Sequence, residues 1–126
     1  MQLRSHLGRV RGLGSSNDGV NHWWMQRLTG VALVPLCLWF VFSIVGLVGA
    51  ELSTVTNWVG RHYNPVLLVL LVICMFYHAQ LGLQVVIEDY IHSESTKVTL
   101  LVFIKLGALL LGACSAFAVI RLTFGG

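Results

Sequence analysis

Charged side chains are scarce in this sequence. Its 126 residues contain eight Lys or Arg and five Asp or Glu, whereas 56% of the residues are hydrophobic. The mean hydropathy is +0.81. A soluble domain of this size cannot bury so much apolar surface, because small domains have a large surface relative to their volume. The composition therefore excludes a small water-soluble fold and predicts an integral membrane protein.

Cysteine clusters and nucleotide-binding motifs are also missing. Cys37, Cys74 and Cys114 stand alone, without CxxC or Cys/His spacing, so no zinc or iron–sulfur site is expected. The sequence has no Gly-rich dinucleotide fingerprint. A chain with so little exposed surface has no basic face for nucleic acid, and we expect no nucleic-acid partner. It is also too short for a second domain or a repeat array.

Three apolar segments are long enough to cross a bilayer, which takes about 20 residues. They span residues 27–50, 65–90 and 96–122 approximately. In hydrocarbon each backbone amide must be bonded within its own segment, so these segments are expected to be helices. The predicted fold class is an all-α integral membrane protein with a transmembrane anchor domain over residues 27–126.

Helix-breaking and capping residues agree with these segments. Pro35 lies inside the first segment and predicts a kink. Asn64 and Pro65 supply a cap and a first-turn proline for the second helix. Ser93 and Ser95 are candidate caps for the third.

Lys and Arg side chains are distributed unequally between the two sides of the membrane. Arg4, Arg9, Arg11 and Arg27 precede the first helix and Lys97 follows the second, whereas only Arg61 and Arg121 lie on the other side. The positive-inside rule then predicts a basic cytoplasmic N-terminal arm over residues 1–26. A bacterial inner membrane is favoured over the mitochondrial inner membrane, although a trimmed mitochondrial presequence is the alternative for the arm. Aromatic residues expected at helix ends fit a membrane-interface belt: Trp23, Trp24, Trp58, Tyr63 and Tyr90.

His78 lies near the middle of the second predicted helix. Ionisable side chains inside a membrane are costly and mark functional sites by default. One interpretation is a neutral histidine hydrogen-bonded to a neighbouring helix, and the other is an axial ligand to haem iron. Ala79 and Gly82 would let a planar group approach the backbone.

An acid and a phenol follow His78 on the same helix. Asp89 comes eleven residues later, close to three full turns, so the two project from one face about 16 Å apart. Tyr90 follows at the interface. Either this arrangement serves electron and proton transfer, or it is an ordinary solvated helix end.

Two sequence motifs carry a family resemblance. The run HAQLGLQVVIEDY, from His78 to Tyr90, resembles the haem-ligand and quinone-site signature of the small membrane-anchor subunit of succinate dehydrogenase (complex II). The run HWWMQRLTGVALVPL, from His22 to Leu36, is similar to the start of the first helix in alphaproteobacterial and related members. The resemblance covers nearly the whole chain.

The resemblance implies a set of roles and partners. The three helices would form half of a heterodimeric haem-binding bundle, with His78 as one axial ligand to the iron of a b-type haem and Arg27 pairing with a haem propionate. Tyr90 would hydrogen-bond a ubiquinone carbonyl, and Asp89 would tune that site. Partners would be the larger cytochrome b anchor subunit, the iron–sulfur subunit, the flavoprotein subunit and membrane lipid. The chain would belong to an oxidoreductase complex while having no activity alone.

Other readings of the chain stay open. It is alternatively a haem-free structural anchor of another membrane-bound oxidoreductase, or a small proton-coupled transporter component using His78 and Asp89. For His22 we expect a solvated interfacial position, and for Lys105 a side chain that snorkels to the cytoplasmic interface. The small residues Ala108, Gly112 and Ala116 predict close helix packing.

Overall fold

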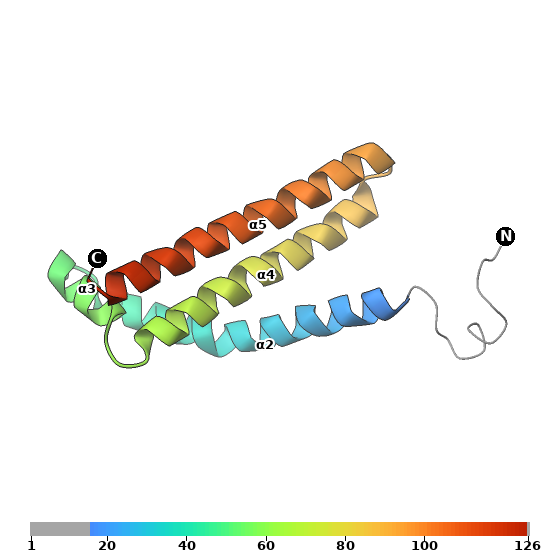
Figure 1. Ribbon diagram of the computed structural model, residues 1–126. Helices are drawn as coiled ribbons and strands as arrows, with labels where there is room; N and C mark the ends of the chain where they lie inside the picture. Colours follow the sequence, from blue (N-terminus) through green and yellow to red (C-terminus); the bar gives the residue numbers. More distant parts are fainter. Residues whose placement is uncertain (1–15, 126) are drawn as a thin grey trace, which may run out of the picture.

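The computed structural model of the chain describes residues 16–125. These residues form four helices and no strand, labelled in Figure 1: α2 (Ser16–Gly46), α3 (Leu52–Val59), α4 (Asn64–Tyr90) and α5 (Glu94–Thr123). Three of the helices have spans long and apolar enough to cross a membrane, at Gly19–Gly46, Asn64–Tyr90 and Glu94–Thr123. The prediction of an all-α fold with three membrane-spanning helices is confirmed.

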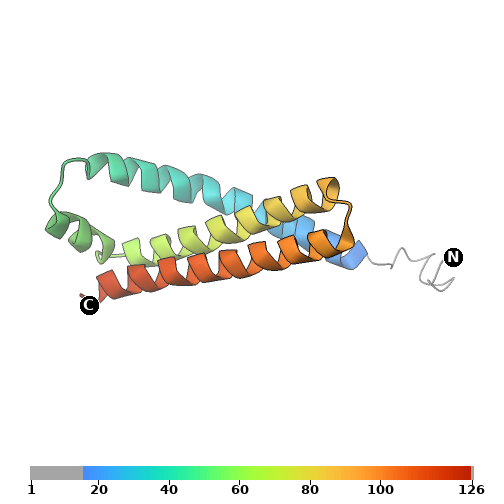
Figure 2. The ribbon, with the colours of Figure 1, turned by 90° about the horizontal axis from the view of Figure 1, so that it is seen from above.

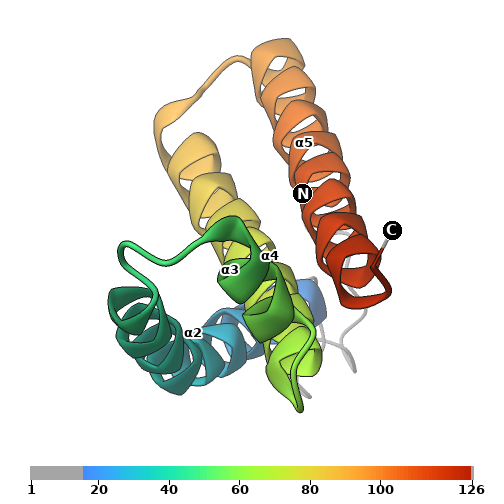
Figure 3. The same ribbon diagram turned by 90° about the vertical axis from the view of Figure 1, so that its left-hand side faces the viewer.

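Helix α4 is the centre of the bundle. It packs against α5 on one side and α2 on the other, whereas within residues 16–125 no Cα atom of α2 lies within 8 Å of a Cα atom of α5. Figure 2 shows α4 and α5 running side by side, whereas the C-terminal half of α2 diverges from α4. The end view in Figure 3 shows that the three long helices do not lie in one plane. Two separate grooves result, both formed on α4.

Little apolar surface is buried within the chain. Among the residues whose burial the structure describes, the buried apolar side chains are Val59, Leu68, Leu71, Leu81 and Ile87. By contrast, Val31, Phe42 and Phe103 are 71%, 75% and 74% exposed. Exposed apolar area costs about 25 cal/mol per Å² in water. Lipid tails or a partner subunit must therefore cover most of the helical surface.

The first helix differs in extent from the segment predicted at 27–50. Helix α2 begins at Ser16 and ends at Gly46, so it continues out of the apolar segment into the residues assigned to the N-terminal arm. Residues 1–15 of that arm lie outside the described part. Hydropathy measures the apolar stretch only, whereas a helix extends as far as its backbone hydrogen bonds do. The chain then turns at Gly49, which has φ of +79°, a conformation that favours glycine.

The proposed caps are used differently from the prediction. Ser93 occupies the N-cap position of α5, but its hydroxyl makes no capping hydrogen bond and lies 3.4 Å from the Ser95 Oγ. Pro65 lies in the first turn of α4 as expected. Asn64 instead donates its Nδ2 hydrogen bond to the Trp58 carbonyl oxygen at 2.7 Å, and so ties α3 to α4.

Helix α3 is an element that the sequence analysis did not predict. The Trp58 ring in α3 stacks on the Trp39 ring of α2, with centroids 5.7 Å apart and an angle of 21° between planes. Gly60, directly after α3, packs on α5, since a Cβ there would lie 3.4 Å from the Thr123 carbonyl oxygen. At eight residues, α3 is too short for a transmembrane pattern. It closes the end of the bundle where α2 and α4 separate.

Candidate functional site

His78 faces helix α2 and is hydrogen-bonded there. Its Nδ1 lies 3.0 Å from the Oγ1 of Thr29, which is only 6% exposed. The Thr29 hydroxyl donates its one proton to backbone carbonyls of its own helix, at 2.7 Å to the Met25 oxygen and 3.2 Å to the Gln26 oxygen. In the tautomer with the proton on Nδ1, Thr29 Oγ1 accepts it. That tautomer leaves the lone pair on Nε2, the state of a histidine that ligates metal.

A glycine allows the close approach of α2 to the His78 ring. A Cβ at Gly30 would lie 3.3 Å from His78 Cε1, tighter than ordinary van der Waals contact, so any side chain there would displace the imidazole. Gly82 lies near α2 as well, where a Cβ would be 3.8 Å from Gln26 Nε2. The two glycines keep the surface beside His78 flat. Ala79, which the sequence analysis placed beside His78, is exposed and does not line this surface.

The space between the two helices is a groove of about 840 Å³, here named the α2–α4 groove. Its volume lies in the range of small-molecule and cofactor sites. The residues that line it come from both helices: Gly19, His22, Trp23, Gln26, Arg27, Gly30, Val31, Val34, His78, Gly82 and Val85. A flat wall with one imidazole fits a planar metal-bearing group such as haem.

Polar groups at one end of the α2–α4 groove have unused hydrogen-bonding capacity. The His22 Nε2 and Gln26 Oε1 atoms are buried without a hydrogen-bond partner in the described part of the chain. The Arg27 guanidinium carbon lies 5.3 Å from the centroid of the Trp23 ring, a cation–π distance. The expectation of a solvated His22 is therefore wrong for its Nε2, which is buried. Carboxylates of a bound group would find an arginine and a histidine here.

The structure brings some of the predicted site residues together and separates others. His78 and Arg27 line the same groove. Asp89 and Tyr90 do not line it, and both are exposed at the end of α4, Tyr90 by 75%. The eleven-residue offset from His78 to Asp89 corresponds to about 16 Å along the helix. The end of α4 is thus a second location, free to contact a partner subunit or a substrate.

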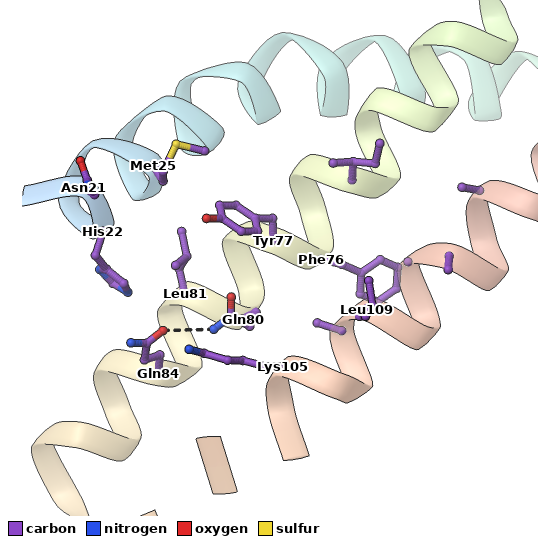
Figure 4. A pocket seen from close by; sticks show the side chains of 15 residues that line it. Asn21, His22, Met25, Phe76, Tyr77, Gln80, Leu81, Gln84, Lys105 and Leu109 are labelled. Carbon is purple, nitrogen blue, oxygen red and sulfur yellow. Dashed lines mark hydrogen bonds between the residues drawn. The ribbon is translucent and has the colours of Figure 1, made fainter. Parts of the chain in front are cut away.

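A second groove lies between α2 and α5 over the surface of α4, and is named here the α2–α4–α5 groove (Figure 4). Its volume is about 770 Å³. Along one side, Gln80 Nε2 donates to Gln84 Oε1 at 3.1 Å, and Gln84 Nε2 donates to Glu88 Oε1 at 3.1 Å. Lys105 also lines this groove, together with His22, which borders both grooves.

Several of these residues were missed by the sequence analysis. Thr29 and Gly30 carry no metal-ligand chemistry of their own, and they are recognised only when α2 is placed against His78. The hydrogen-bonded row of Gln80, Gln84 and Glu88, named here the glutamine ladder, could have been found in the sequence. These three residues repeat every four positions and so share one helix face.

Comparison with known proteins gives a consistent family match. The profile described as succinate dehydrogenase/fumarate reductase transmembrane subunit matches residues 1–119. The chain is 34% identical over 108 residues to the succinate dehydrogenase hydrophobic membrane anchor subunit of Rickettsia bellii, with 86% of each chain covered.

Two relatives of lower identity are also named as membrane anchor subunits of succinate dehydrogenase. The succinate dehydrogenase membrane anchor subunit of Reclinomonas americana is 28% identical over 97 residues, covering 75% of this chain and 81% of its own. The hydrophobic membrane anchor subunit of Paracoccus denitrificans is 25% identical over 116 residues, covering 92% and 89%. No solved structure gives a significant match. With a profile match over most of its length and a relative above 30% identity, the chain belongs to the succinate dehydrogenase/fumarate reductase transmembrane subunit family.

Proposed function

We propose that this chain is the hydrophobic membrane-anchor subunit of a succinate dehydrogenase. In this role it tethers the flavoprotein and iron–sulfur subunits, shares a b-type haem with the larger anchor subunit, and contributes to the site of quinone reduction. The observation that carries the haem assignment is the position of His78: it lines the α2–α4 groove, and its Nδ1 is hydrogen-bonded to Thr29 Oγ1 at 3.0 Å, so Nε2 is the nitrogen that would ligate iron.

His78 is the proposed iron ligand. Thr29 would hold the ring at Nδ1 and favour the tautomer protonated there, and Gly30 leaves room beside the neighbouring Cε1. When bound, haem supplies a one-electron relay inside the membrane. A groove that is open on one side requires a second wall, which in this proposal is the larger anchor subunit with the other axial ligand.

Arg27 is proposed to pair with a haem propionate. A guanidinium–carboxylate pair is a charge-assisted hydrogen bond, stronger than a neutral one. The Trp23 ring restrains the guanidinium at one end of the groove.

The end of α4 is the proposed contribution to the quinone site. Tyr90 and Asp89 are exposed there, where a partner subunit and ubiquinone could be reached together. Tyr90 would donate a hydrogen bond to a ubiquinone carbonyl oxygen, and Asp89 would tune that site. Succinate oxidation itself belongs to the partner subunits in this proposal, so the chain alone has no activity.

The membrane orientation follows from charge. With most Lys and Arg on the side of the N-terminus and the α4–α5 turn, the proposed cytoplasmic face is the one that carries Tyr90, and the catalytic subunits dock there. A bacterial inner membrane is the proposed location. The proton-coupled transporter has less support, because His78 and Asp89 lie in separate places along α4.

The test uses the complete complex purified in mild detergent. His78→Ala is expected to abolish the haem spectrum of a bis-histidine centre, because one axial ligand is lost. His92→Ala is the matched control, since His92 lies in the turn between α4 and α5 and lines neither groove. Normal haem content and an unchanged spectrum in His78→Ala would contradict the assignment and leave a haem-free anchor.

A further inference from the structure

We propose that the α2–α4–α5 groove binds an anionic membrane phospholipid, with the phosphate at Lys105 and one acyl chain along the small residues of α5. This site is separate from the α2–α4 groove. It does not depend on haem or quinone binding.

The charge on Lys105 is the first argument. Lys105 lies eleven residues after the start of α5, about 16 Å along the helix axis. Helix α5 has 30 residues and is about 45 Å long, against about 30 Å of hydrocarbon. With the hydrocarbon centred on α5, the Cα of Lys105 lies about 8 Å inside the apolar layer, so the side chain extends its ammonium toward the cytoplasmic interface, where lipid phosphates lie.

No carboxylate of the described chain compensates Lys105. The ion pair found within residues 16–125 joins Lys97 to Glu94 at 3.7 Å. Glu88, at the end of the glutamine ladder, accepts a hydrogen bond from Gln84 instead. A basic pocket between membrane helices, near one face of the bilayer, is the usual form of an anionic lipid headgroup site.

Neutral donors in the groove add to this cation. In Figure 4 the Lys105 amine lies beside Gln84 and Gln80, and His22 faces the same space from α2. The His22 Nε2 is buried without a partner among residues 16–125. In the tautomer that carries the Nε2 proton, His22 is a donor that a phosphate oxygen would satisfy. The polar end of the groove thus combines one positive charge with unused hydrogen-bonding capacity.

The opposite end of the groove is apolar, as an acyl chain requires. Gly112, Ala113 and Ala116 line it on α5, and Ile73 and Phe76 line it on α4. A Cβ at Gly112 would lie 3.7 Å from the Phe76 ring, so α4 forms the floor. Because the Cα atoms of α2 and α5 stay more than 8 Å apart within residues 16–125, the groove leaves a slot between the two helices. A quinone carbonyl in the slot would accept a hydrogen bond from the Lys105 ammonium, whereas a phospholipid phosphate would also neutralise its charge.

The test measures phospholipid retained by the delipidated complex, by native mass spectrometry and lipid extraction. Lys105→Gln is expected to reduce retention of one anionic lipid per copy of the chain by about tenfold or more, since a charge-assisted contact is lost. Lys97→Gln is the control, because that lysine is already paired with Glu94. Ala113→Leu fills the slot and is expected to remove the same lipid while Lys105 is intact.

The outcomes separate the proposal from its rivals. Equal retention in wild type and Lys105→Gln contradicts the proposal, as does retention of a quinone in place of a phospholipid. If Lys105→Gln fails to assemble, the delipidated wild-type complex is instead offered phosphatidylglycerol or phosphatidylcholine. Selective uptake of phosphatidylglycerol supports the site, and equal uptake of the two overturns it.

Discussion

The two grooves share helix α4 and a common border at His22, yet they are built in opposite ways. In the α2–α4 groove the helices meet closely at Gly30, and the central polar group, His78, has one nitrogen already hydrogen-bonded. In the α2–α4–α5 groove the Cα atoms of the flanking helices stay more than 8 Å apart, and the central polar group is the Lys105 ammonium, which forms no ion pair within residues 16–125. An imidazole held by a hydrogen bond suits a ligand bond with defined direction, whereas a flexible cation suits charge compensation.

A substitution that fills the α2–α4 groove and leaves the α2–α4–α5 groove unchanged should have the largest effect on haem content. Gly30→Leu places a side chain where even a Cβ would lie 3.3 Å from the His78 ring, so His78 must move. We expect most of the haem to be lost while the anionic lipid is retained, measured by absorption spectroscopy and lipid extraction of the same purified complex.

The matched control for this change is Gly46→Leu, at the other end of α2, where a Cβ would meet nothing within 4 Å. Its haem content should equal that of wild type. Haem loss in both variants, or in neither, would contradict the claim that haem binding depends on the α2–α4 groove at Gly30.

The exposed end of α4 should respond differently from either groove. Tyr90→Phe removes one hydroxyl, and with it one hydrogen bond to a bound quinone carbonyl. A hydrogen bond is worth about 1 kcal/mol, so quinone reduction should become roughly five- to tenfold less efficient. Succinate oxidation with an artificial acceptor should not change, and neither should the haem spectrum.

Tyr63→Phe is the control for this variant, because Tyr63 is an exposed tyrosine beside the opposite end of α4. Unchanged quinone kinetics in Tyr90→Phe would exclude Tyr90 from the quinone site.

The smallest expected effect concerns the tuning of His78. Thr29→Val keeps the shape of the side chain and removes the acceptor for the Nδ1 proton. That hydrogen bond makes the imidazole a stronger donor to ferric iron, so its loss should raise the haem midpoint potential. If the lost hydrogen bond is worth about 1 kcal/mol, the midpoint potential of this one-electron couple should rise by roughly 40 mV. Redox titration checks it, and Thr29→Ser should restore the wild-type value. The same haem midpoint potential in wild type and Thr29→Val would exclude a role of Thr29 in tuning His78.

Hydropathy was sufficient to predict the fold class, because a span of about 20 apolar residues has few alternatives in a membrane. It failed at the boundaries, where α2 extends to Ser16 beyond the apolar segment, and it missed α3. Short interfacial helices depend on tertiary contacts such as the Trp39–Trp58 stack, which no local pattern contains.

The candidate site was predictable only in part. His78 stands out as an ionisable residue within an apolar segment, and Arg27 follows from the family resemblance. The roles of Thr29, Gly30 and the His22 Nε2, which has no partner within residues 16–125, follow only from the packing of α2 against α4. The roles of Asp89 and Tyr90 remain predictions, since both lie on a surface that a partner would complete.

The most direct test of the account is the haem content of the wild-type complex, purified with its partner subunits and examined by absorption and electron paramagnetic resonance. We predict one low-spin b-type haem with two histidine ligands for each copy of this chain. A fully assembled and active complex without haem would contradict the central claim, and the α2–α4 groove would then be a packing surface only.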